Sequence, residues 1–103
     1  MSYKHNNLMA IRENYWKDEH SLQVQTEKHF FCQLLNDHGI FNEASLEDAK
    51  YVFFSLPSII IVKGYALGFM HDQVTQMISK YIAQNKVHLQ QRSHLKIRYQ
   101  MSS

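Results

Sequence analysis

The sequence predicts an all-α fold, a single domain of five or six helices. Apolar residues recur at helical spacing along most of the 103 residues, which is the signal of amphipathic helices. The one run of β-branched residues, Ile59 to Val62, lies within such a helical pattern, so no pair of strands is indicated. Gly39, Pro57 and Gly68 fall close to the expected helix ends, where these residue types belong.

Three helices are expected in the N-terminal half. The first spans Ser2 to Glu19 and carries an apolar stripe. The second begins at Ser21 and stops at Gly39, because glycine readily adopts the left-handed conformation that often follows a helix. The third opens at Ser45-Leu46-Glu47-Asp48, which has the residue types of a capping box, and runs through Phe54.

The remaining helices are expected in the C-terminal half. Pro57 to Leu67 forms one, with the proline in the first turn, and Gly68 closes it. His71 to Ile82 has the cleanest helical pattern, and we expect a turn at Ala83 to Asn85 and a last helix from Lys86 to Tyr99. The apolar stripe of the helix over 71–82 consists of Val74, Met77, Ile78, Tyr81 and Ile82.

The last helix has only a thin apolar stripe. Val87 and Leu95 are expected to face the core. At about 100° per residue, the far side then holds Leu89, Arg92, Ser93 and Lys96. A helix with so few core contacts leaves its outer side available for a ligand.

Charge is divided unequally along the chain. Residues 1–72 carry six Lys or Arg against nine Asp or Glu, a net charge of −3. Residues 73–103 carry five Lys or Arg and no acid, so their +5 brings the whole chain to +2. One face of the protein is therefore expected to bind a polyanion.

DNA is the polyanion that the helix pattern favours. A helix-turn-helix has an apolar support helix, a short turn and an under-buried second helix whose outer side enters the major groove. Segments 71–82, 83–85 and 86–98 fit this order, with 86–98 as the recognition helix of a sequence-specific transcription regulator. The residues expected to read bases are Gln84, Leu89, Gln90, Arg92 and Ser93. Those expected to contact phosphates are Lys80, Lys86, Lys96 and Arg98.

A second register of the same motif is compatible with the sequence. Residues 63–69, followed by Val74 and Met77, also have the spacing of small and apolar positions in a helix-turn-helix. The helix over 71–82 would then be the reading helix. Its best side chains form an apolar stripe and Lys80 is its one basic residue, so the first register ranks higher.

The C-terminal half resembles the DNA-binding domain of LuxR-type bacterial regulators. The residues that carry this resemblance are Tyr65-Ala66-Leu67-Gly68-Phe69, Val74, Ile78 and the later basic helix. Met70 departs from the LuxR pattern, which has a small polar residue after Gly-Phe, and the support helix is slightly longer.

The chain is also similar to the short adhesin-biosynthesis regulators of fimbrial operons, the PapB/FocB family, which have about this length. The residues of that similarity are Glu27-Lys28-His29-Phe30-Phe31, Lys63-Gly64-Tyr65, Gly68, Lys80-Tyr81, Asn85, Leu89 and Leu95. LuxR-type and PapB/FocB proteins bind DNA as dimers or higher oligomers, and the resemblance implies a bacterial regulator of this kind.

The N-terminal half is rich in aromatic residues: Tyr15, Trp16, Phe30, Phe31, Phe41, Phe53 and Phe54. They supply an ordinary core, or part of them forms a dimer interface, where aromatic residues are enriched. We divide the single domain of residues 1–103 into N-terminal helices at 1–54 with the core and a dimerisation surface, a helix-turn-helix part at 55–99 and a tail at 100–103. A homodimer would enlarge the small contact made by one recognition helix.

Other function classes have less support. The seven histidines are dispersed and Cys32 stands alone in an apolar context, so we expect no metal, no cofactor and no enzyme activity. The N-terminus has no apolar signal region, and a lone buried thiol fits a reducing compartment, so a cytoplasmic location is expected. The competing class is a small protein-binding adaptor, or a phage- or plasmid-encoded inhibitor, that does not bind DNA.

Overall fold

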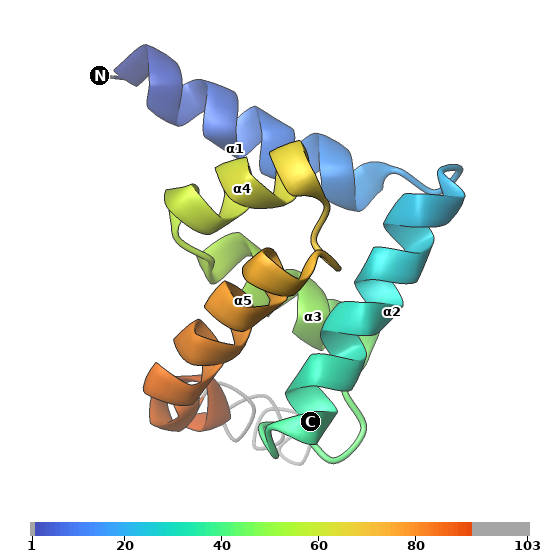
Figure 1. The fold of residues 1–103 in the computed structure, drawn as a ribbon, viewed down its shortest axis with the longest axis vertical. Coiled ribbons are helices and arrows are strands. Elements are labelled where there is room, and N and C mark those ends of the chain that lie inside the picture. Colours follow the sequence, from blue (N-terminus) through green and yellow to red (C-terminus); the bar gives the residue numbers. More distant parts are fainter. Residues whose placement is uncertain (1, 92–103) are drawn as a thin grey trace, which may run out of the picture.

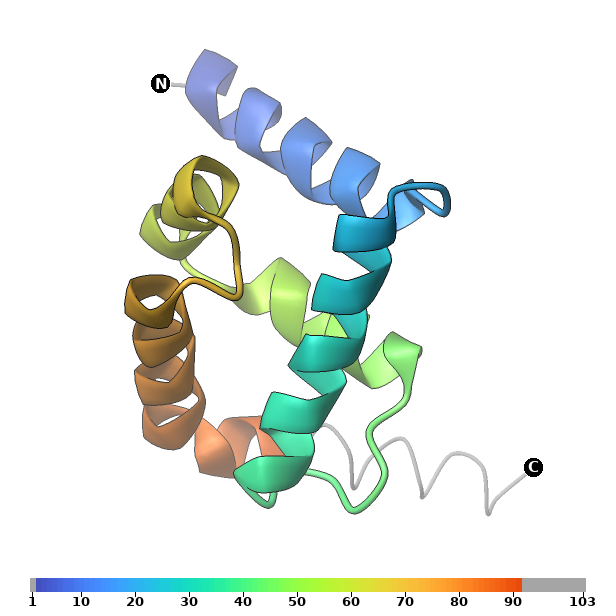
Figure 2. The same cartoon turned by 45° about the vertical axis from the view of Figure 1, so that its right-hand side comes forward.

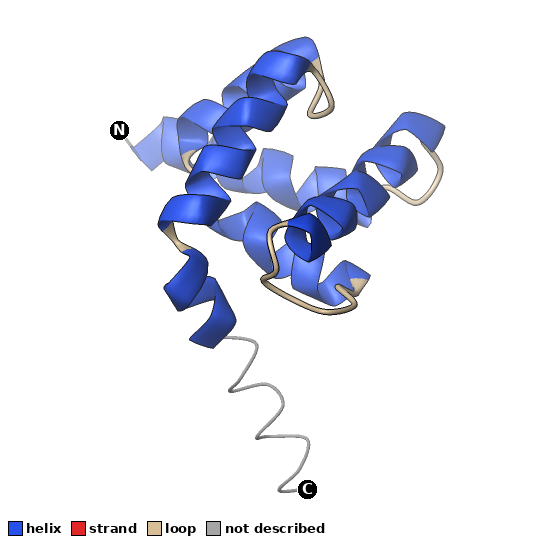
Figure 3. Cartoon of the chain, turned by 60° about the horizontal axis from the view of Figure 1, so that its bottom comes forward, coloured by secondary structure: helices blue, strands red, loops and turns tan. Residues whose placement is uncertain are grey.

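The structure, a computed structural model, describes the backbone of residues 2–91 and the side chains of residues 7–91. It contains α1 (Ser2–Lys17), α2 (Leu22–Asp37), α3 (Leu46–Ser55), α4 (Ser58–Leu67) and α5 (Asp72–Gln84). Residues 86–91 are also helical, and we call them the 86–91 segment. The described part of the chain contains no strand, which confirms the all-α prediction (Figure 3).

The helices surround one core. α2 packs on α3, α4 packs on α5, and α1 contacts both α3 and α4. In Figures 1 and 2, α2 and α5 form two sides of the molecule, with α3 between them and α1 crossing next to α4. The 86–91 segment follows α5 at the end of the molecule where α2 also ends.

The helix ends follow the local signals in the sequence. Ser21 is the N-cap of α2, and its hydroxyl accepts a hydrogen bond from the N–H of Val24. Ser45 and Asp48 form the predicted capping box at the start of α3. Gly39 follows α2 with a φ of +71°, a conformation that glycine adopts without steric cost.

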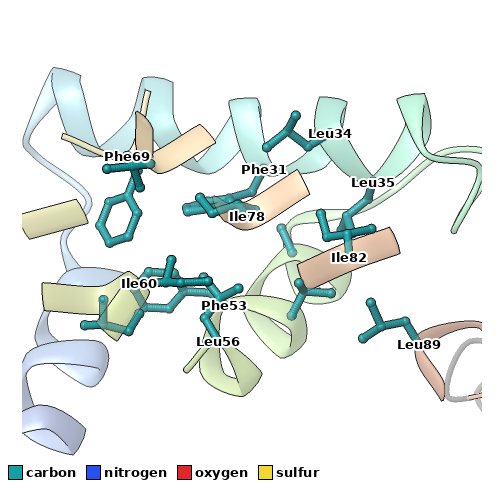
Figure 4. Packing of buried hydrophobic residues seen from close by; sticks show 14 of the residues in the cluster. Phe31, Leu34, Leu35, Phe53, Leu56, Ile60, Phe69, Ile78, Ile82 and Leu89 are labelled. Carbon is teal, nitrogen blue, oxygen red and sulfur yellow. The ribbon is translucent and has the colours of Figure 1, made fainter. Parts of the chain in front are cut away.

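The aromatic residues of the N-terminal half form the core rather than a free surface. Tyr15, Phe31 and Phe53 are buried in the core, and Trp16, Phe30, Phe41 and Phe54 are partly buried and pack against that core. Figure 4 shows Phe31 and Phe53 next to aliphatic side chains from α4 and α5. Of the two interpretations of these aromatic residues, the structure supports the ordinary core.

Two buried cations join α1 to its neighbours. The Arg12 guanidinium donates to the carbonyl oxygen of Leu56 at 2.8 Å, which satisfies a carbonyl at the C-terminal end of α3. Burial lowers the pKa of Arg12. The Lys28 ammonium donates to the carbonyl oxygens of Trp16 at 2.7 Å and Asp18 at 2.8 Å. These bonds hold α1 against the α3–α4 corner and α2.

Within residues 2–91, no single helix has both the length and the apolar composition needed to cross a bilayer. Only α3 and α4 taken together pass such a test of length and composition, and they are bent by 112° relative to each other.

Candidate nucleic-acid interface

The break between α5 and the 86–91 segment is a bend at one residue. The predicted turn at Ala83 to Asn85 is wrong, because α5 continues to Gln84 and helical structure resumes at Lys86. The Asn85 side-chain amide donates to the Tyr81 carbonyl at 2.8 Å, and the Asn85 carbonyl accepts from the N–H of Leu89 at 3.0 Å. No glycine or proline lies near residue 85, so the chain has no strong local reason to form a longer turn.

The face assigned to the last helix is also wrong over its described part. Leu89, predicted to contact bases, is 0% exposed, whereas Val87, predicted to face the core, is 68% exposed. Figure 4 shows Leu89 at the Ile82 end of the core. Two residues span about 200° of a helix, so Val87 and Leu89 cannot both face inward. Leu89 is the one that packs in the core. Because its side chain is buried there, Leu89 is not a base-reading residue.

The other predicted contact residues have different outcomes. Gln90 is exposed, but its side-chain amide donates to the Gly39 carbonyl at 3.2 Å and so ties the 86–91 segment to the end of α2. Gln84, Lys80 and Lys86 are exposed on α5 and just after it. The remaining four lie outside the described residues: Arg92, Ser93, Lys96 and Arg98.

The outer face of α5 carries a polar stripe, of which only Lys80 and Gln84 were predicted from the sequence as contact residues. Gln73, Gln76, Lys80 and Gln84 are all exposed, and their i, i+3, i+7, i+11 spacing places them on one side of the helix. The opposite side is buried through Val74, Ile78 and Ile82. The stripe is the complement of the apolar pattern on α5, so this helical spacing is the signal in the sequence from which Gln73 and Gln76 could also have been predicted.

α4 and α5 are separated by the four residues Gly68 to His71. Gly68 has a φ of +96° and ends α4. Phe69 then turns inward and is 1% exposed. A Cβ atom on Gly64 would lie 2.1 Å from Cε1 of Phe69, so the Phe69 ring uses the space that the glycine leaves. The second register would use α4 and α5 as the two helices of the motif, with these four residues as its turn.

Hydrogen bonds hold this turn in place. The N–H of Phe69 donates to Oε2 of Glu27 at 3.0 Å, and the Tyr15 hydroxyl donates to Oε1 of the same carboxylate at 2.8 Å. The Thr75 hydroxyl donates to the Phe69 carbonyl at 3.2 Å. At the start of α5, Nδ1 of His71 accepts from the N–H of Gln73 at 3.1 Å. The buried Glu27 thus connects α1, α2 and the turn that precedes α5.

We expect the folded protein to lose stability as pH rises above about 9 to 10. Burial raises the pKa of Tyr15, Tyr65 and Cys32 above their ordinary values of 10, 10 and 9. Below those values the three side chains are protonated in both the folded and the unfolded chain, so the free energy of unfolding does not depend on their titration. Above them the unfolded chain releases protons that the folded chain keeps, which favours unfolding. Urea midpoints measured from pH 8 to pH 11 should fall, and Tyr15→Phe should make the fall shallower; a flat profile in the parent chain would contradict this.

Scans against protein-family models, curated proteins and solved structures found no match to this chain. Among residues 7–91, no three His, Cys, Asp or Glu side chains are grouped so that they could hold a metal ion.

Proposed function

We propose that this chain is a bacterial-type, sequence-specific DNA-binding transcription regulator. In this proposal α4, the turn at 68–71 and α5 form a helix-turn-helix, and α5 lies in the major groove. The observation that carries the proposal is the exposed stripe of three glutamines and a lysine on α5, opposite a fully apolar inner face. Side-chain amides pair with the N6 and N7 edge of adenine, and amine groups contact guanine or phosphates.

The electrostatics support a DNA ligand. After Asp72 the chain contains no further acidic residue. Beyond its first turn, α5 therefore has no negative side chain that would repel a DNA phosphate. Lys80 and Lys86 are exposed on α5 and directly after it. In this proposal the 86–91 segment, attached through Leu89 and Gln90, holds Lys86 next to α5 and does not enter the groove itself.

Two substitutions on α5 should have different effects on DNA binding. Gln76→Ala should cost about 1–3 kcal/mol for the preferred sequence and little for random duplex, because an amide that reads a base carries sequence information. Lys80→Ala should weaken binding to all sequences and lower the salt slope by about one unit, because it removes a phosphate contact. Fluorescence anisotropy with selected and random duplexes at several salt concentrations measures both effects.

Lys50→Ala is the matched control, because Lys50 is an exposed lysine on α3. It should leave affinity and salt slope close to those of the parent chain. Equal small effects from Gln76→Ala, Lys80→Ala and Lys50→Ala would count against the proposed surface. If the first register operated instead, Arg92→Ala would relax sequence preference and Gln76→Ala would not.

One observation favours a second candidate, the protein-binding adaptor. The outer face of α4 is apolar, with Ile59 61% and Val62 55% exposed, and exposed apolar patches mark interaction sites. In a regulator this face would contact a second copy of the chain; in an adaptor it would contact another protein. Absence of any duplex shift at low salt would favour the adaptor, and light scattering of the isolated chain would detect the homodimer.

A further inference from the structure

Two neighbouring hollows are lined by residues of α2 and by residues at the end of α4 and in the α4–α5 turn. The first has a volume of about 460 Å³ and is bordered by the apolar side chains of Leu22, Leu67 and Met70. The second has a volume of about 330 Å³ and is bordered by aromatic side chains that include Tyr15 and Tyr65. Both volumes are within the range of small-molecule sites, roughly 300–1,000 Å³. The two hollows share four lining residues: Gln23, Glu27, Leu67 and Gly68.

Glu27 is a buried carboxylate at this shared wall. Glu27 is 4% exposed, and its hydrogen-bond donors among residues 7–91 are all neutral: the Tyr15 hydroxyl at 2.8 Å, the Phe69 N–H at 3.0 Å and the Gln23 amide at 3.5 Å. Buried carboxylates are usually paired with a cation, because burial removes the water that stabilises the charge. The buried cations of residues 7–91, Arg12 and Lys28, donate instead to backbone carbonyls. The wall therefore has a negative charge without a cationic partner among the described side chains.

Three aromatic residues, Tyr15, Tyr65 and Phe69, line the second hollow together with Glu27. The ring centroid of Tyr15 lies 5.9 Å from that of Tyr65 and 5.3 Å from that of Phe69. After burial, the charge of Glu27 is among the causes that raise the pKa of both tyrosines, so its negative potential reaches their hydroxyl groups. Aromatic faces combined with a carboxylate attract organic cations.

We propose that these hollows bind a small organic cation, with its ammonium group next to Glu27 and its aliphatic body along Leu22, Leu67 and Met70. The carboxylate supplies charge complementarity, and the apolar walls supply contact for a hydrocarbon chain. An alcohol of the same length would gain the apolar contact and a hydrogen bond to the carboxylate but no ion pair, and a carboxylate would be repelled.

Binding at Glu27 would regulate DNA binding, a consequence that rests on the proposed function of α5. Oε2 of Glu27 accepts the N–H of Phe69 in the turn that precedes α5. An ammonium group competes for that oxygen and loosens the turn, so duplex affinity falls when the cation is bound. By linkage, duplex DNA weakens cation binding by the same factor, of the order of fivefold or more for an allosteric coupling.

The test measures binding of n-hexylammonium, hexanol and hexanoate to the full chain without DNA, by NMR chemical-shift titration. We expect hexylammonium to bind about tenfold or more tightly than hexanol, which can donate a hydrogen bond to the carboxylate but lacks the charge pair, and we expect hexanoate not to bind. Equal binding of hexylammonium and hexanol would overturn the proposal. The same ammonium group could belong to a lysine side chain of another protein. Tighter binding of N-acetyl-lysine amide than of hexylammonium would identify that source.

Two variants locate the site. Thr26→Trp places a large side chain at the rim of the larger hollow from an exposed position on α2, and it should abolish hexylammonium binding. Gln33→Trp is the matched control, because residue 33 is exposed two turns further along the same face of α2; it should bind as the parent chain does. Loss of binding in both variants, or in neither, would contradict the location.

Glu27→Gln tests the charge directly, and a folded variant should bind hexylammonium no better than hexanol. If this variant does not fold, the Thr26→Trp and Gln33→Trp pair still decides the outcome. Because these titrations contain no DNA, failure of the cation site is distinguishable from failure of the DNA interface. Anisotropy with a duplex, with and without saturating hexylammonium, then measures the coupling; unchanged duplex affinity would remove the regulatory part.

Discussion

Replacing Gly64 with alanine is expected to destabilise the protein by about 3 kcal/mol, although the same change usually stabilises a helix by about 1 kcal/mol. The added Cβ would lie 2.1 Å from Cε1 of Phe69 and 2.4 Å from its Cδ1, which no side-chain adjustment at position 64 can relieve. The Phe69 ring would have to leave a site in which it is 1% exposed. Forcing it out approaches the cost of removing a core phenylalanine, about 3–5 kcal/mol.

A double-mutant cycle separates this clash from a general effect of substitution in α4. Phe69→Leu removes the ring, so Gly64→Ala should cost much less in the Phe69→Leu background than in the parent chain. Ala66→Val adds volume to α4 at an exposed position and should change the urea midpoint only slightly. Additive effects of Gly64→Ala and Phe69→Leu would show that the ring does not occupy the space above Gly64.

Replacing Phe53 with alanine is expected to cost about 3–5 kcal/mol, a large part of the about 5–15 kcal/mol that stabilises a typical domain. Phe53 is 0% exposed and lies at the centre of the aromatic cluster. Its ring centroid is 4.8 Å from that of Tyr15, 5.3 Å from that of Trp16 and 5.6 Å from that of Phe31. The cavity left behind would border α1 and α2 as well as α3. A shift of one of these helices alone would therefore not close it.

Denaturant unfolding measures this cost, with Phe54→Ala as the neighbouring control. Phe54 is only partly buried, so its truncation removes less contact and should cost clearly less. Similar losses for Phe53→Ala and Phe54→Ala would mean that Phe53 is not the centre of the core. A cavity lined by aromatic rings is expected to stay dry and to bind a small apolar molecule, so added benzene should restore part of the stability of Phe53→Ala.

The two substitutions concern different parts of the proposed interface. Phe53 supports the whole core, so its loss should weaken DNA binding only through unfolding. Gly64 and Phe69 set the turn before α5, so Gly64→Ala should weaken DNA binding even where the variant remains folded. Comparing duplex affinity with the folded fraction of each variant separates the two causes.

The helices themselves could be predicted from the sequence because their signals are local. Apolar spacing and caps depend on residues three or four positions apart, and Ser45, Gly39 and Gly68 marked ends that the structure reproduces. The candidate interface was harder to predict. The basic residues after residue 85 predicted a recognition helix there, whereas the polar stripe on α5 consists mostly of uncharged glutamines.

The sequence by itself determined an all-helical chain, the approximate bounds of its helices and the separation of its charge, since each follows from neighbours along the chain. Only the tertiary structure decided that Leu89 rather than Val87 is buried, because Val87 and Leu89 are equally suited to a core and the choice depends on the space beside Ile82. It also decided that the carboxylate of Glu27 holds the turn at Phe69, because the two residues are 42 positions apart and leave no local pattern from which that contact could be predicted.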